Sequence, residues 1–200
     1  MTGGKTDNLT RAERIFVRIS VVQTVIAVIG FFVGAVALYA ALNEADAVRK
    51  QQQAAVWPHI RVTDVNFGTP GEERFDIVVS NKGIGPARIE MVNVTIGGVE
   101  QTSWYEIVRA LPDGETAGIS SYRLADATLS PEEDIVAVSV EAKYGSLELV
   151  NAFRDLVRGG EAAMEICYCS VFDDCWMIKA AERRPSPIKR CPAQKSDSLF

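Results

Sequence analysis

The longest apolar stretch of the chain lies near its amino end, in residues 19–42. These residues contain no charge, and a helix of about 20 apolar residues can cross the hydrocarbon layer of a bilayer. We therefore expect residues 15–42 to form one transmembrane helix. A cleaved signal peptide is the alternative, since Ala45-Asp46-Ala47 has the form of a cleavage site. We favour a retained anchor, because a signal core has only roughly 7–15 apolar residues.

The helix is expected to extend beyond the apolar stretch at both ends. Thr10-Arg11-Ala12-Glu13 fits a capping box at the helix start. Residues 43–56 are mostly Ala, Glu, Gln, Arg and Lys, which are good helix formers. Pro58 disfavours the helical conformation of the residue before it. This pattern predicts a helical stalk that ends just before Pro58.

Beyond residue 57 the apolar pattern changes to a period of two, which is typical of strands. Two segments break the series: Ser103-Trp104-Tyr105-Glu106 is a second capping-box pattern, and Ser146 precedes a stretch with apolar residues on one helical face. We expect seven or so antiparallel strands in an immunoglobulin-like sandwich with one or two short helical insertions. The strand candidates are residues 60–67, 75–80, 89–96, 119–124, 135–144, 164–172 and 175–179.

The chain is thus predicted to have five parts. They are a cytoplasmic tail (1–14), a transmembrane helix (15–42), a helical stalk (43–56), an extracytoplasmic β-sandwich domain (57–181) and a Pro-rich basic tail (182–200). The last part lacks periodicity, and we expect it to be extended or disordered unless a partner or Cys191 holds it.

A glycine turn separates the second and third strand candidates. Gly83 and Gly85 permit backbone angles that other residues resist, and Pro86 restricts the entry to the next strand. The pattern V-x-N-x-G-x-G-P-A resembles that of CARDB-type and related immunoglobulin-like sandwich domains. The whole layout resembles a diffuse group of uncharacterised bacterial single-pass membrane-anchored proteins. This resemblance implies a role in adhesion, scaffolding or subunit contact, and it supplies no catalytic residue.

The spanning segment contains a G-x-x-x-G motif, formed by Gly30 and Gly34. Two glycines one turn apart let another helix approach closely, which favours packing between membrane helices. We expect this face to contact a helix of a membrane assembly, or a second copy of the chain in a homo-oligomer. The chance occurrence of this common spacing is the alternative.

All four cysteines lie near the carboxyl end, at Cys167, Cys169, Cys175 and Cys191. An even number of cysteines outside the cytoplasm indicates two disulfides, with three possible connectivities. A hairpin with a five-residue loop would place Cys169 opposite Cys175 on one sheet face, and Cys191 would then pair with Cys167. A Cys175–Cys191 bridge remains open, as do a zinc site on four thiolates and a redox-active C-x-C pair.

The distribution of charge favours one orientation. Arg11, Arg14 and Arg18 precede the apolar stretch, whereas Glu44 and Asp46 follow it, and basic flanks tend to stay in the cytoplasm. We therefore expect a single-pass protein of the cell inner membrane with a cytoplasmic amino terminus and a periplasmic domain. After residue 42 the chain carries 17 basic and 24 acidic residues, and this acidic balance argues against a nucleic-acid partner.

No catalytic motif stands out. His59 is the single histidine, there is no nucleophile elbow and no phosphate-binding glycine loop, and no cofactor is expected. The chain is predicted to be a non-enzymatic accessory subunit that docks into an integral membrane protein complex through its helix and its β domain. An extracytoplasmic ligand-binding or sensing module that signals through a membrane partner is the alternative, and an enzyme is a third reading.

Overall fold

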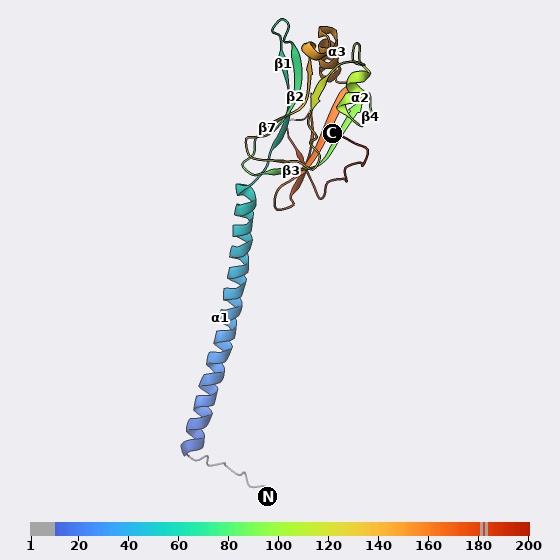
Figure 1. Cartoon of the computed structure of the whole chain (residues 1–200). Helices are drawn as coiled ribbons and strands as arrows, with labels where there is room; N and C mark the ends of the chain where they lie inside the picture. The colour runs from blue at the N-terminus through green and yellow to red at the C-terminus, as the bar shows by residue number, and fades with distance from the viewer. Residues whose placement is uncertain (1–10, 181, 183) are drawn as a thin grey trace. The chain divides into compact units, whose positions relative to one another are not determined.

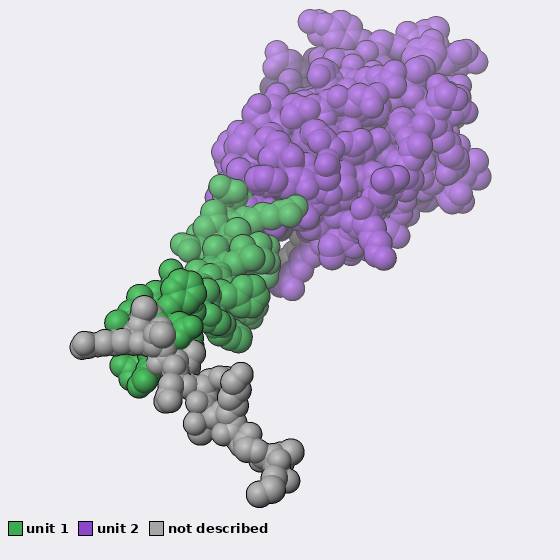
Figure 2. Space-filling view, turned by 90° about the horizontal axis from the view of Figure 1, so that it is seen from below, with its two compact units in different colours: residues 1–52 green, residues 53–200 purple. Residues whose placement is uncertain are grey.

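The computed structural model describes residues 11–180, 182 and 184–200. The chain divides into two compact units, with the boundary between residues 52 and 53 (Figure 2). Each unit is described by itself below.

The first unit is dominated by one helix, α1, which runs without interruption over Arg11–Ala55 (Figure 1). Its most apolar 18-residue window has a mean hydropathy of 2.5, and none of that window is buried within the chain. The helix is therefore long and apolar enough to span a membrane. The expectation that it continues through the stalk and stops before Pro58 is confirmed. Thr10, the expected cap, lies outside the described residues.

The second unit is mainly β, and every strand pair in it is antiparallel. One sheet has four strands in the order β1-β2-β7-β5, and the other has six, in the order β10-β9-β8-β3-β4 with β6 also paired to β3. The strands are β1 (Ile60–Phe67), β2 (Arg74–Asn81), β3 (Ala87–Ile96), β4 (Val99–Glu100), β5 (Ile119–Ser121), β6 (Thr128–Leu129), β7 (Asp134–Glu141), β8 (Ala162–Cys169), β9 (Cys175–Lys179) and β10 (Ser186–Ile188).

The two sheets share one hydrophobic core. Phe75 and Val140 contribute from the four-stranded sheet, and Ile166 and Tyr168 contribute from the six-stranded sheet. Alternate residues of β2 and β8 reach this core, as the period of two predicts. The strand candidates at residues 60–67 and 175–179 match β1 and β9 in full, whereas the segment at 135–144 ends as a 3₁₀ turn over Ala142–Tyr144.

Both expected helical insertions are present. The helix α2 covers Trp104–Arg109 and α3 covers Leu147–Arg158. The hydroxyl of Ser103 accepts a hydrogen bond from the Glu106 amide, and that of Ser146 accepts one from the Leu149 amide, as helix caps require. The carboxylate of Glu106 bonds to Thr102 instead of closing a capping box.

The last residues are an integral part of the β domain. Residues 186–188 form β10 against β9, and the Phe200 side chain is fully buried in the core. Its ring lies edge-to-face with that of Trp104, at a centroid distance of 5.2 Å. Its carbonyl accepts a hydrogen bond of 3.1 Å from Ala125. Residues 184–200 of the tail are thus held in place, as the expectation allowed for a tail tied by Cys191.

Substitution of Phe200 by Ala should strongly destabilise the domain, because removal of a buried phenylalanine costs about 3–5 kcal/mol. The matched control is Leu199→Ala, since Leu199 is 61% exposed and should change stability by no more than about 0.5 kcal/mol. Urea unfolding of the full chain in detergent, followed by tryptophan fluorescence, measures both. Equal unfolding midpoints for the two variants would contradict the placement of Phe200 in the core.

Candidate functional site

The glycine face of α1 is open. A Cβ built on Gly30 or on Gly34 would meet no atom within 4 Å outside the local helix. The two glycines are four residues apart, so they lie one above the other on the same face. Large apolar side chains flank them, including Phe31 and Val33, and both are exposed. This face has the shape that close helix packing requires, and no part of the described chain occupies it.

A buried asparagine organises the start of the β domain. The Asn81 side chain is fully buried. Its Oδ1 accepts hydrogen bonds from the amides of His59 (3.1 Å) and Gly83 (3.0 Å). Its Nδ2 donates to the carbonyls of Gly85 (2.8 Å) and Leu129 (3.1 Å). All the hydrogen-bonding capacity of one buried amide is thus used, and it ties the glycine turn to the residues just after α1 and to Leu129 of β6.

The two glycines of this turn are required by close approach of the backbone. A Cβ on Gly83 would lie 2.4 Å from the Trp57 carbonyl, and one on Gly85 would lie 1.8 Å from the Val56 carbonyl. Neither glycine is among those with a positive φ. The expectation that unusual backbone angles explain these residues is therefore wrong: they are glycines because the chain that leaves α1 passes directly against them. We call residues 81–85 and the segment 56–59 that they hold the glycine clamp.

An ion pair lies beside the clamp. Lys82 Nζ donates to Asp134 Oδ1 at 2.8 Å. Hydrogen bonds from Lys82 and then from Ser80 hold the pKa of the Asp134 carboxyl below its usual value. Because both side chains are well exposed, the pair adds little to stability.

The substitution Gly85→Ala should destabilise the β domain by about 2 kcal/mol or more, since overpacking usually costs 1–3 kcal/mol and the obstructing atoms belong to backbone. Gly68→Ala is the matched control, because its Cβ would meet nothing within 4 Å. Urea unfolding of both variants tests this. An unfolding midpoint of the Gly85 variant equal to that of the control would contradict the close approach of the Val56 backbone to Gly85.

The cysteines are joined in two pairs. Cys167 and Cys191 have their sulfurs 1.99 Å apart, and Cys169 and Cys175 have theirs 2.07 Å apart. These are the pairs that the hairpin argument favours over a Cys175–Cys191 bridge. Cys169 and Cys175 face each other in the β8–β9 register. Because Cys167 and Cys169 alternate with the core residues Ile166 and Tyr168, both disulfides lie on the side of the sheet that faces away from the core.

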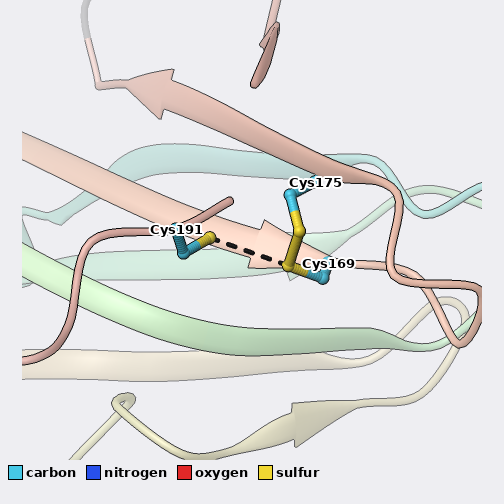
Figure 3. Close-up of side chains that lie close together, drawn as sticks. All are labelled: Cys169, Cys175 and Cys191. Carbon is cyan, nitrogen blue, oxygen red and sulfur yellow. Dashed lines mark hydrogen bonds between the residues drawn. A yellow bond between two sulfur atoms is a disulfide. The ribbon is translucent and has the colours of Figure 1, made fainter. Parts of the chain in front are cut away.

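The two disulfides are in contact with each other. Cys169 Sγ lies 3.7 Å from Cys191 Sγ, as the dashed line in Figure 3 marks. The sulfurs of Cys169, Cys175 and Cys191 all lie within 4.8 Å of one another. The described cysteines are all bonded, and a disulfide sulfur is not the thiolate that zinc binds. In this oxidised form one disulfide ties the segment that carries Cys191 to β8, and the other joins β8 to β9.

The residues after Cys191 cross the outer side of the six-stranded sheet. The side-chain amide of Gln194 pairs with the backbone of Val92 as a strand would: Oε1 accepts from the Val92 amide at 2.8 Å, and Nε2 donates to its carbonyl at 3.2 Å. Between this segment and the sheet lies a cavity of about 360 Å³. Its lining includes Met91, Glu165 and Met177 from the sheet.

A buried tyrosine lies where the two sheets meet at β1. Burial raises the pKa of Tyr168 to about 12, and the backbone of Ile60 offsets part of that rise. Its hydroxyl has no partner at good hydrogen-bond geometry, and its ring stacks on that of Trp176 at 5.8 Å. Ionisation of this phenol in the folded protein is therefore opposed.

Stability should fall above pH 10 because of Tyr168. A free tyrosine has a pKa near 10, so the unfolded chain loses this proton between pH 10 and 12 while the folded chain keeps it. The contribution is fully present below pH 10 and is lost as the pH rises towards 12. We expect the free energy of unfolding to drop by about 1.4 kcal/mol between pH 9 and pH 11 from this group. Tyr168→Phe should remove that part of the slope, whereas Tyr122→Phe should not. Identical pH profiles for all three proteins would refute the assignment.

The predicted site residues therefore fall into two separate groups. Gly30 and Gly34 lie on the open face of α1, and the four cysteines lie together on the outer side of the six-stranded sheet. Sequence reasoning missed Asn81 and Gln194, whose roles depend on long-range contacts. For Asn81 the signal was available, because a short polar residue directly before a double-glycine turn is a frequent backbone cap. His59 contributes its backbone amide to the clamp, and its ring lies 5.4 Å from that of Trp57.

No protein-family model, curated protein or solved structure matches this chain. The resemblance of the glycine turn to CARDB-type domains therefore stays a prediction.

Proposed function

We propose that this chain is a non-enzymatic accessory subunit, anchored by α1 in a membrane and docked into a larger membrane protein assembly. In this proposal the helix packs against a partner helix through the Gly30/Gly34 face. The β domain contacts parts of the same assembly outside the bilayer.

One observation carries the proposal: no residue in the most apolar window of α1 is buried within its own chain. Exposed apolar surface on this scale is strongly unfavourable in water, at about 25 cal/mol for each Å². A lipid environment removes this cost, and the open glycine face gives a site at which a second helix can approach closely.

We further propose that the domain lies on the periplasmic side of the cell inner membrane, with the amino terminus in the cytoplasm. Arg14 and Arg18 before the apolar stretch, and Glu44 and Asp46 after it, support this orientation. The two disulfides support it independently, because such bonds persist in oxidising compartments.

The β domain is proposed to be immunoglobulin-like. Two antiparallel sheets that share one core support this assignment. The two inserted helices and the short strands β4, β6 and β10 are additions to a simple sandwich. A contact role is the usual use of such domains in the families that the glycine turn resembles.

A double substitution tests the helix contact. Gly30→Ile with Gly34→Ile should block close approach and reduce the partner recovered with the full chain in mild detergent by about tenfold or more, equivalent to about 1.4 kcal/mol. Val28→Ile with Phe32→Ile is the matched control, since these residues have the same spacing and lie on the opposite side of the helix. Unchanged recovery of the partner with the glycine variant, or equal loss with the control, argues against docking through this face.

The cavity of about 360 Å³ beside the Cys191 segment favours a second candidate function, a ligand-binding or sensing module. A cavity of this volume is large enough for a small ligand. Such a module would act through a membrane partner. A monomer that shows no partner in detergent and is thermally stabilised by a small molecule would favour this reading over the accessory subunit.

A further inference from the structure

One strand edge in the β domain differs from the others. The strand β1 is at the margin of its sheet and pairs only with β2 (Figure 1). It has eight residues, whereas the marginal strands β4, β5 and β10 have two or three. A long unpaired edge is a template for another strand. The short edges offer little backbone for such pairing.

The register of β1 shows which of its backbone groups are free. Lys82 donates to the carbonyl of His59, so that pair is hydrogen-bonded across the β1–β2 ladder. Because bonded and non-bonded pairs alternate in antiparallel sheets, the N–H and C=O groups of Val62, Asp64 and Asn66 point away from β2. Within the described residues, no backbone hydrogen bond reaches these groups from any other element.

Three of the devices that usually protect an edge are missing from β1, and its one inward charge, Asp64, is paired with Arg158 of α3. The strand contains no proline and no lysine, and its pairing with β2 is continuous, without a bulge. Each of these devices blocks strand addition in natural sheets. Their absence along eight residues leaves the edge competent to pair.

A hollow of about 260 Å³ lies beside the first half of this edge. It is lined by His59–Val62 on one side, and by Ile178, Ala180 and Glu182 on the other. A side chain of an added strand could enter this hollow.

Charge decides what kind of strand fits. The even-numbered residues of β1 face the core, as Ile60 and Val62 show, so the odd-numbered residues face outwards. Arg61 is exposed on that outer side, and it forms no ion pair among the described residues. A carboxylate directly across from it would form a favourable cross-strand pair.

A second copy of β1 does not supply this carboxylate. Two antiparallel copies that continue one sheet place outward residues opposite outward residues. The outward residues of β1 are Arg61, Thr63, Val65 and Phe67, and none of them is acidic. A strand from a different protein is therefore the better complement.

We propose that the free edge of β1 binds an extended segment of the partner protein by strand addition, and that an acidic residue of this segment lies opposite Arg61. The backbone groups of Val62, Asp64 and Asn66 form the new ladder. This proposal rests on the proposed accessory function, and it assigns the surface that the β domain uses.

The test is photo-crosslinking of the full chain in intact cells. A benzophenone amino acid replaces Thr63 on β1, and Ser120 on β5 is the control position on the other margin of the same sheet. We expect an adduct at position 63 alone, with one acidic segment of a partner.

The substitution Val62→Pro removes a free N–H and leaves the β1–β2 ladder intact, so it should reduce the adduct about tenfold. Asn66→Pro repeats this test in case the Val62 variant does not fold, as judged by its thermal unfolding. Arg61→Glu should also weaken the adduct, and reversal of the partner's acidic residue should restore it.

Three results would overturn the proposal: no adduct at position 63, an adduct only with a second copy of the chain, or an adduct that both proline variants leave unchanged. If the partner still co-purifies with the wild-type chain when position 63 gives no adduct, strand addition fails while the accessory function stands. If there is neither co-purification nor an adduct, both proposals fail.

Discussion

The structure depends on one constraint, which is that the apolar surface of α1 must find a medium other than water. The chain itself does not cover it, since the residues of the most apolar window are all exposed. Burial of such surface is the dominant favourable term in protein energetics. In the proposed membrane-anchored arrangement, lipid covers this surface, and the two disulfides fit the proposed location of the β domain across the membrane from the cytosol.

Specific contacts hold the chain at the two ends of the β domain, where it has little regular secondary structure. At its beginning, Asn81 and the two glycines of the clamp hold the residues that follow α1. At its end, the disulfide of Cys191 and the buried ring of Phe200 hold a segment with little secondary structure of its own. In the sequence, the strands of the two sheets lie between these two sets of contacts.

Much of the fold follows from local patterns, because helices and strands have characteristic periods. The length of α1, the two capped helices and the strands β1 and β9 were all predictable from the residues. The short strands β4, β6 and β10 were not, since each has only two or three residues and exists because a longer neighbour offers it a partner. The role of Phe200 was also hidden. One aromatic residue in a basic, proline-rich stretch carries no period, and only the tertiary structure shows the space that it fills beside Trp104.

The cysteines stabilise the β domain, and their redox state reports the compartment in which the domain lies. Their redox state and accessibility in cells therefore test the proposed membrane topology most directly. A membrane-impermeant maleimide is applied to intact cells, after the outer envelope has been made permeable, with and without prior reduction. The account predicts no labelling before reduction, labelling of all four cysteines after it, and recovery of the protein in carbonate-washed membranes. Thiols that react only after the inner membrane is broken, or a chain that the carbonate wash releases, would contradict it.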